Sequence, residues 1–227
     1  MVSVLAFDTG GGACSTAVLR DGALAARRLE PMERGHAEAL IPMIDAVLAE
    51  AGIAVDALDL IAVTTGPGAF TGLRIGLAAA RGLSLASGVP ALGISRFAAA
   101  AAAVPPQRQA GSTLVVALDS KRRELYLQAF AAGEPTGEGA LVPPEDIPLW
   151  LPAGKLRLAG DAAAALARLV AGRPDVTQEE GPGLVDAAVV ATLAAAQWRP
   201  GWRPPPPRPL YLRAPDTTMP RRAARAP

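Results

Sequence analysis

The residues best suited to chemistry lie near the N-terminus, where Asp8 and Thr9 precede three glycines, Gly10, Gly11 and Gly12. Backbone N–H groups of a glycine-rich turn can surround phosphate oxygens, and an aspartate can hold a water bound to magnesium. Asp8, Thr9 and Gly10 are therefore candidates for a nucleotide site. A hairpin turn that needs positive φ angles and is capped by an aspartate explains the same residues without a ligand, and we favour it.

Two further segments contain residue types that can bind an anion. Gly66-Pro67-Gly68 precedes a helical pattern, and a helix N-terminus has free N–H groups. It is not a Walker loop, because no Gly-Lys-Ser or Gly-Lys-Thr follows, and a rigid strand-to-helix turn explains it. Asp119 begins a charged run that could meet a phosphate, although such runs are usually solvated turns.

Metal and nucleophilic catalysis have little support in the residue types. His36 is the only histidine and Cys14 the only cysteine, whereas zinc and iron sites usually need several His, Cys, Asp or Glu ligands. No G-x-S-x-G motif is present to form a serine nucleophile. We interpret His36 as a helix-start residue and Cys14 as a packed small residue. The sequence thus predicts no catalytic residue, no metal and no cofactor.

Composition and charge favour a globular protein with no general affinity for polyanions. Of the 227 residues, 51% are hydrophobic and 19% charged, and the net charge is +1, so no overall field draws the chain to nucleic acid or membrane. A single cysteine fits a reducing compartment. The first residues, MVSVLAFDTGG, lack the basic region of a signal peptide, and no run is long enough to span a bilayer. We expect a cytoplasmic location.

The first half of the chain must position Asp8 on a mixed sheet. Apolar runs predict strands over residues 2–7, 15–20, 23–30, 60–65 and 89–93. Asp21-Gly22 between the second and third strands is a strong type I′ hairpin signal. Helices are predicted over 36–51, ended by Gly52, over 71–87, ended by Gly88, and after the N-cap Ser95.

The second half repeats this plan after a linker over residues 105–112. Strands are predicted over 113–119, 124–131 and 156–159, and helices over 161–171 and 184–198. As in the first half, a strand ends in an aspartate, Asp119, and is followed by a second strand. We therefore predict an α/β fold with two duplicated halves, residues 1–104 and 105–203, each a mixed sheet covered by helices. In the Pro- and Arg-rich tail, 204–227, we expect Pro204 to Arg213 to pack back and the end to be disordered.

The predicted helix over residues 71–87 is apolar in nearly every direction, with only Arg74 and Arg81 charged. A helix that is apolar all round is buried all round, and its own sheet can cover only one side. Gly72, Gly76 and Ala80 are spaced by four and would let a second helix approach closely. A central helix within a single domain is the alternative, and we favour a partner.

The helix over 36–51 completes this predicted partner surface. Glu38 and Asp45 are seven residues apart, as are Arg74 and Arg81, so each pair lies on one face of its helix and the two pairs could meet at the edge of a helix seam. The predicted surface comprises twelve residues: Glu38, Leu40, Ile41, Ile44, Asp45, Gly72, Leu73, Arg74, Gly76, Leu77, Ala80 and Arg81.

Several stretches together resemble the TsaB family, also called YeaZ. They are DTGGGACSTAVLRDG, RGHAEALIPMIDAVL, TTGPGAFTGLRIGLAAARGL, LDSKRRELY and the late PLYLR. The resemblance runs from residue 2 to about residue 213; its central block is specific and the second half looser. It implies the actin/Hsp70/sugar-kinase fold, with two ribonuclease H-like halves.

The resemblance also implies a role without catalysis. TsaB-like proteins pair with TsaD, a metal-carrying paralogue that transfers threonylcarbamoyl to N6 of the adenosine 3′ of the anticodon, in tRNAs reading codons beginning with A. TsaE, an ATPase, joins them. The resemblance implies a heterodimer with TsaD, and we expect contact with tRNA only through the complex. The exposed apolar helix predicts a homodimer when the chain is isolated.

Two alternatives remain open. The chain could be an active ATPase or kinase of the same fold, using Asp8-Thr9-Gly10 and Asp119. Such proteins place an acidic residue and a glycine at the second phosphate loop, whereas Ser120 and Lys121 follow Asp119, and Gly160-Asp161 is only a thin adenosine-binding motif. The pocket therefore looks degenerate. The family is also labelled glycoprotease-like, which suggests a metallopeptidase, but TsaD-type proteins use a pair of histidines as metal ligands, and only His36 is present.

Overall fold

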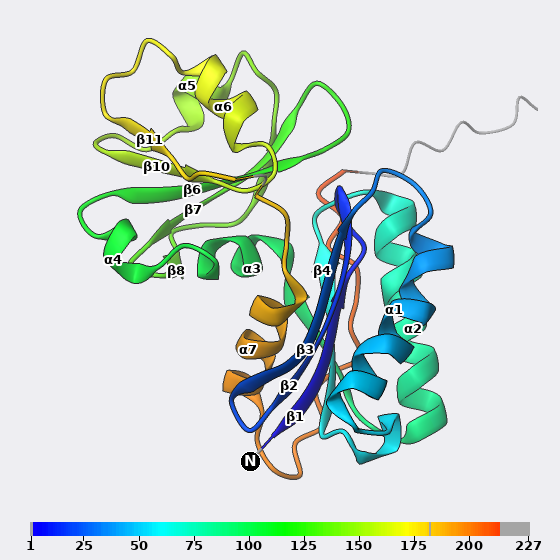
Figure 1. The fold of residues 1–227 in the computed structure, drawn as a ribbon. Coiled ribbons are helices and arrows are strands. Elements are labelled where there is room, and N and C mark those ends of the chain that lie inside the picture. The colour runs from blue at the N-terminus through cyan, green and yellow to red at the C-terminus, as the bar shows by residue number, and fades with distance from the viewer. Residues whose placement is uncertain (1, 182, 214–227) are drawn as a thin grey trace, which may run out of the picture.

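A computed structural model of the chain describes residues 2–181 and 183–213. It contains two mixed sheets, each covered by helices on both faces (Figure 1). We call the first sheet with helices α1, α2 and α7 the first lobe, and the second sheet with helices α3 to α6 the second lobe. This arrangement is the predicted one of two α/β halves.

The first sheet has the strand order β3-β2-β1-β4-β5. Its strands are β1 (Ser3–Asp8), β2 (Ala13–Arg20), β3 (Ala23–Pro31), β4 (Leu60–Gly66) and β5 (Ala91–Ser95). Strands β1, β2 and β3 form an antiparallel meander, and β4 and β5 add to β1 in parallel. Asp21 and Gly22 have φ angles of 53° and 82°, so the predicted turn between β2 and β3 is confirmed.

Helices α1 (His36–Ala51) and α2 (Phe70–Ser87) cover one face of the first sheet, beside a short 3₁₀ helix, η1 (Val55–Ala57). Side chains alternate along β1, so Leu5 and Phe7 pack against these helices while Val4 and Ala6 face the opposite side. Both long helices end at a glycine with positive φ, as predicted for Gly52 and Gly88.

The second sheet repeats the topology of the first, with the order β11-β10-β6-β7-β8 and β9 also paired to β7. Its strands are β6 (Thr113–Asp119), β7 (Leu125–Ala131), β8 (Glu134–Pro135), β9 (Ala140–Val142), β10 (Leu156–Ala159) and β11 (Val176–Gln178). An antiparallel hairpin, β6 and β7, is again extended by parallel strands, β10 and β11. The predicted duplication of the plan is thus visible strand by strand.

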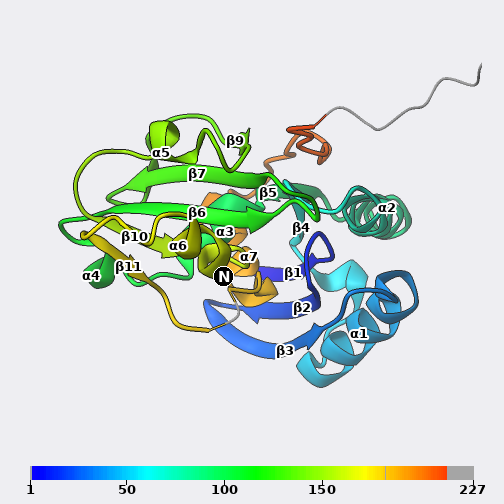
Figure 2. The ribbon, with the colours of Figure 1, turned by 90° about the horizontal axis from the view of Figure 1, so that it is seen from above.

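Four shorter helices belong to the second lobe: α3 (Arg96–Ala102), α4 (Pro106–Gln109), α5 (Ile147–Trp150) and α6 (Ala163–Leu169). Ser95 caps α3 as predicted, accepting a hydrogen bond from the Phe97 amide. Helix α3 lies on one face of the second sheet and α5 and α6 on the other, as Figure 1 shows from the side, while Figure 2 looks down on the same sheet from above. Because α3 follows β5 directly, it links the two sheets.

Helix α7 (Ala187–Gln197) departs from the packing expected of a second half. It lies within residues 105–203 but packs on the first sheet, opposite α1 and α2, through Val190, Ala191 and Ala194 (Figure 1). Its start is tied to the first lobe, since the Ala187 amide donates to Ser15 Oγ at 2.8 Å. The division of the chain between residues 104 and 105 therefore stays a prediction. By sequence α7 belongs to the second half, but in space it belongs to the first lobe.

The tail segment 204–213 runs back along the first lobe. The Leu210 amide donates to the Thr65 carbonyl at 2.8 Å, and Arg81 donates to the Pro207 carbonyl at the same distance. The predicted disordered end falls on residues 214–227, which lie outside the described residues. Within the part of the chain that the structure describes, no helix has both the length and the apolar character to span a bilayer.

Candidate functional site

The acidic residues singled out in the two halves meet where the strand ends of the two sheets face each other. Asp8 ends β1, Asp119 ends β6, and Asp161 follows β10. In α/β sheets, ligands bind beyond the carboxyl ends of the parallel strands, so this is where a nucleotide would be sought. We call the group formed by Asp8, Asp119, Asp161 and Arg96 the strand-end junction.

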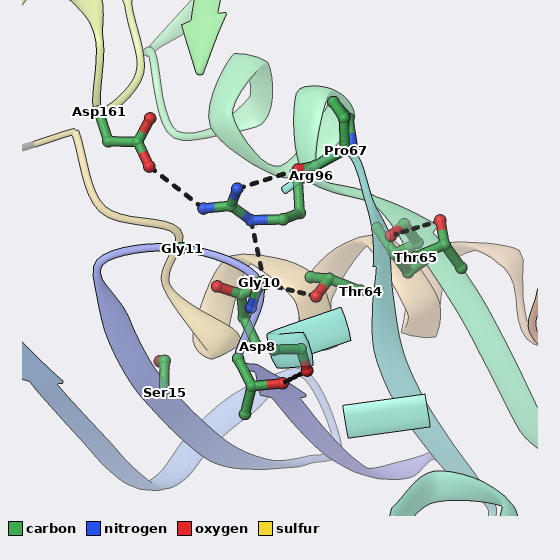
Figure 3. A network of polar contacts seen from close by, with 12 residues as sticks. Asp8, Gly10, Gly11, Ser15, Thr64, Thr65, Pro67, Arg96 and Asp161 are labelled. Atoms are coloured by element: carbon green, nitrogen blue, oxygen red, sulfur yellow. Dashed lines mark hydrogen bonds and ion pairs between the residues drawn. The ribbon is translucent and has the colours of Figure 1, made fainter. Parts of the chain in front are cut away.

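Arg96 lies at the centre of the junction (Figure 3). Its side chain is 1% exposed, its Nε lies 3.1 Å from Asp8 Oδ1, and its Nη2 donates to Asp161 Oδ2 at 3.3 Å. Its Nη1 donates to the Pro67 carbonyl at 3.0 Å. Burial alone would lower the pKa of the guanidinium, but the charges of Asp8 and Asp161 outweigh it and raise that pKa, so Arg96 is charged.

The predicted nucleotide residues of the first lobe are all engaged with the protein itself. Asp8 is buried, and its Oδ1 accepts hydrogen bonds from the Thr64 hydroxyl and from the Gly10 amide. The hydroxyl of Thr9, also buried, donates to the Gly72 carbonyl at 2.7 Å. These residues hold the loop after β1 against α2, and Asp8 caps the turn as expected. Gly10, Gly11 and Gly12 do not have positive φ angles, so that part of the turn interpretation was wrong.

Asp119 and Asp161 are joined to each other in the second lobe. The Asp119 amide donates to Asp161 Oδ1 at 2.8 Å, while the Asp119 carboxylate lies 3.0 Å from the Lys121 ammonium. The hydrogen bond that the Lys121 ammonium makes to the Asp119 carboxylate raises the pKa of Lys121, and burial raises the pKa of Asp161 although the Arg96 charge opposes it. Gly160 has φ of 99° and packs against Ala117, so the Gly160-Asp161 pair shapes the junction.

A cavity of about 520 Å³ adjoins the junction, lined in part by Thr9, Gly11, His36, Thr71 and Lys121. His36 starts α1 as predicted and is buried, with Nε2 3.2 Å from the Gly11 carbonyl oxygen. Cys14 is packed in the core, where burial raises the pKa of its thiol to about 12. Over residues 2–181 and 183–213, no three His, Cys, Asp or Glu side chains gather as a metal site would require.

The twelve residues of the predicted partner surface divide into two groups. Five are exposed: Glu38, Ile41, Asp45, Arg74 and Arg81. Seven are buried within the chain itself: Leu40, Ile44, Gly72, Leu73, Gly76, Leu77 and Ala80. The exposed residues of α2 form one stripe with Phe70, Ala78 and Leu85, because these positions recur every three or four residues.

The reason given for including the small residues of α2 was wrong. A Cβ atom on Gly72 would lie 2.1 Å from the Thr9 carbonyl oxygen, and one on Gly76 would lie 2.7 Å from Thr9 Oγ1. The close approach that these glycines allow is therefore to the chain's own first lobe and not to a partner helix. Leu85 is 88% exposed, so the chain itself leaves the outer side of α2 uncovered, and a partner on that side stays a prediction.

The two arginines of α2 contact the tail within this chain. Arg74 lies over the Phe70 ring, 3.7 Å from its centroid, and its Nε donates to the Tyr211 hydroxyl at 3.4 Å. The rings of Phe70 and Tyr211 are 5.1 Å apart between centroids. The tail thus packs at the start of the exposed stripe.

Sequence reasoning missed Arg96 as a site residue. In the sequence Arg96 is an isolated charged residue between Ser95 and an alanine-rich helix, and such a residue is typical of an ordinary helix start. Its role depends on Asp8 and Asp161, which are distant in sequence, so no local pattern could have found it.

Comparison with known proteins gives a consistent family. Residues 30–142 match the model of the TsaD family, described as tRNA N6-adenosine threonylcarbamoyltransferase. The chain is 37% identical over 125 residues to the tRNA threonylcarbamoyladenosine biosynthesis protein TsaB of Haemophilus influenzae, a match that covers 55% of this chain and spans about half (52%) of that relative. The solved structure of YeaZ from Pseudomonas aeruginosa is similar with a TM-score of 0.79 and 32% identity, covering 93% of this chain and all (100%) of that chain.

A more distant structural neighbour confirms the predicted fold class. Inorganic polyphosphate/ATP-glucomannokinase from an Arthrobacter strain superposes with a TM-score of 0.52 and 12% identity, covering 87% of this chain and 100% of that chain. At this identity the likeness concerns the fold alone. Together with the two mixed sheets, it places the chain among the two-lobed, actin-like α/β folds.

Proposed function

Since this chain belongs to the TsaB (YeaZ) family, we propose that it serves threonylcarbamoyladenosine formation in tRNA as a non-catalytic partner subunit of a TsaD homologue. In this proposal the TsaD homologue transfers threonylcarbamoyl to N6 of the adenosine 3′ of the anticodon. A TsaE homologue completes the complex, and tRNA is bound only through it.

The observation that carries the partner role is the exposed stripe on α2, together with the outer face of α1. Leu85 is 88% and Ile41 46% exposed, and each apolar residue has charges on its own helix, Arg81 on α2 and Asp45 on α1. Interfaces combine an apolar centre with a charged rim, which is the composition found here. We call this surface the α1–α2 face.

The same surface suggests what covers it. The TsaD family model matches residues 30–142, a range that includes both α1 and α2, so a TsaD homologue would offer two similar helices. Two such pairs related by a pseudo-twofold axis would form a four-helix contact. We propose that in isolation a second copy of this chain takes the place of the partner.

The interactions at the strand-end junction do not favour the ATPase alternative. The carboxylates of Asp8 and Asp161 are paired with Arg96, and that of Asp119 with Lys121. A nucleotide with magnesium would have to displace Arg96, which is buried, as well as the exposed Lys121. The metallopeptidase alternative rests on a family label alone.

Reconstitution of the modification tests the proposal. The TsaD and TsaE homologues, tRNA and a supplied threonylcarbamoyl adenylate are combined with and without this chain, and the modified adenosine is measured by mass spectrometry of the digested tRNA. We expect modification only when this chain and the TsaD homologue are both present. Modification by this chain alone, or equal modification without it, would contradict the proposal.

A further inference from the structure

The burial of Arg96 is unexplained by the proposed function. Its guanidinium is 1% exposed although it stands at the start of α3, the short second-lobe helix that follows β5 of the first lobe directly. A buried charge is retained only where opposite charges and hydrogen bonds compensate for the lost hydration. The partners of Arg96 therefore indicate what its burial achieves.

These partners come from both lobes. Asp8 ends β1 in the first lobe and Asp161 follows β10 in the second, and the guanidinium lies between them at 3.1 and 3.3 Å (Figure 3). The Pro67 carbonyl, from the loop between β4 and α2, accepts the remaining Nη1 donor at 3.0 Å. A single side chain thus closes an ion-paired bridge from sheet to sheet.

The glycine loop is closed around the same side chain. A Cβ atom on Gly11 would lie 2.1 Å from Arg96 Nη2, one on Gly10 2.9 Å from Arg96 Cδ, and one on Gly68 3.0 Å from Arg96 Nη1. Gly11 is therefore needed to admit the arginine, whereas a Cβ on Gly68 would first meet the Gly10 carbonyl oxygen at 2.2 Å and one on Gly10 would first meet Leu73 at 2.7 Å. The space in which a glycine-rich turn could surround a phosphate is filled by a cation that belongs to the chain.

We propose that Arg96 is a built-in cation that locks the two lobes together at the strand-end junction, in place of any metal or phosphate group. The lock holds the first-lobe loop of residues 10–12 and the second-lobe loop of residues 160–162 in one arrangement. The lobes consequently form a rigid body that does not open and close around a nucleotide. This inference is independent of the identity of the partner.

Amide hydrogen exchange of the full chain tests the lock. In Arg96→Met the amides of residues 10–12 and 160–162 should exchange at least tenfold faster, while those of β6 in the second-sheet core keep their wild-type rates. The control is Arg123→Met, which removes an exposed ion pair with Glu145 inside the second lobe and should change neither loop. Wild-type rates at both loops, or a uniform rise throughout both sheets, would overturn the proposal.

A second variant decides the matter if Arg96→Met does not fold. Asp161→Asn keeps the Oδ1 acceptor for the Asp119 amide but replaces the Oδ2 that faces Arg96. Faster exchange at residues 160–162, with β6 unchanged, supports the lock, and unchanged exchange there overturns it. Magnesium and ATP added to the wild-type chain should leave both loops unaltered, whereas protection of residues 10–12 would show that the space accepts a nucleotide and overturn the proposal.

Discussion

Arg96 and Glu179 are both held by two opposite charges, but they lie in different surroundings. Arg96 is enclosed between Asp8 and Asp161 at the strand-end junction. Glu179 accepts hydrogen bonds from Arg108 and Arg157 at the edge of the second lobe, where Arg108 remains exposed. Water screens Arg108 but not Arg96. Removal of Arg96 therefore leaves two buried carboxylates without their cation, while removal of Glu179 leaves Arg108 solvated and Arg157, which is 22% exposed, partly buried.

The Glu179 cluster gives a pH-dependent prediction. Burial raises the pKa of Glu179, but the hydrogen bonds and charges of Arg108 and Arg157 outweigh it, so that pKa lies below the ordinary value of 4.5. A depressed carboxyl pKa stabilises the fold above the unfolded value, and this stabilisation is lost as the pH falls through the folded pKa.

We expect Glu179→Gln to lower the free energy of unfolding by about 1 kcal/mol at pH 7, after allowance for screening. The difference between variant and wild type should shrink as the pH falls below 4.5. Urea unfolding at a series of pH values measures it. A difference that grows on acidification would contradict the assignment.

At the scale of helices and strands, α2 has two faces with opposite requirements. Its inner face carries Gly72 and Gly76 against Thr9, where no side-chain atom fits. Its outer face carries Leu85 and Gly82, which have open space around them. We therefore expect the same substitution to destabilise the fold on the inner face of α2 and to be tolerated on its outer face.

Alanine in place of glycine tests the inner face. Gly72→Ala should destabilise the fold by about 2 kcal/mol or more, because the new Cβ would lie 2.1 Å from the Thr9 carbonyl oxygen. The matched control is Gly82→Ala, which meets nothing within 4 Å and should stabilise the helix by up to about 1 kcal/mol. Both are measured by urea unfolding at one protein concentration. Equal effects would mean that α2 does not lie against Thr9.

A charge tests the outer face as a partner surface. Leu85→Glu should weaken binding to the TsaD homologue at least tenfold, about 1.4 kcal/mol, while circular dichroism shows an unchanged fold. The matched control is Leu149→Glu on α5. The two leucines are equally exposed, Leu149 at 89% and Leu85 at 88%, but only Leu85 lies on the α1–α2 face. Calorimetric titration gives both affinities. If the two variants bind alike, the interface lies elsewhere.

This choice replaces Gly76→Glu, which the sequence alone would favour for disrupting the interface. A Cβ at Gly76 would lie 2.7 Å from Thr9 Oγ1 and 3.3 Å from Val63. A glutamate there would disturb the first lobe itself, so a loss of binding would report misfolding. The exposed residues give the cleaner test.

At the scale of the whole molecule, three features join the halves that the sequence divides at residues 104 and 105. Helix α7 returns from the second half to the first sheet, α3 follows β5 but packs on the second sheet, and Arg96 pairs with aspartates of both lobes. Because of these contacts, neither half is expected to fold or unfold independently of the other.

We therefore expect a single cooperative unfolding transition. Residues 1–104 without α7 would expose the apolar face formed by Val4, Ala6 and Leu60, so neither half should melt alone. Differential scanning calorimetry measures this by comparing the calorimetric and van't Hoff enthalpies. Two separate transitions would show that the halves are independent domains.

Local sequence patterns determined the longer elements, because their causes are local, but they did not predict the short elements β8, β9, β11, α4 and α5. The Asp21-Gly22 turn, the C-terminal glycines of α1 and α2 and the Ser95 cap each depend on the backbone preferences of one or two residues. The repeated strand order followed from Asp8 and Asp119 standing at equivalent strand ends. The family followed from whole stretches of sequence rather than from single motifs.

Only the tertiary structure decided which face of each element is free. Periodicity shows that α2 is apolar on nearly all sides, but it cannot say that Gly72 and Gly76 meet Thr9 while Leu85 meets solvent. It also cannot place α7 on the first sheet, since a helix that is apolar all round fits either one. The sequence shows that residue 96 is a cation, but its ion-pair partners, Asp8 and Asp161, lie far from it in the chain. Only folding brings the three side chains together, so the role of Arg96 could be recognised only in the tertiary structure.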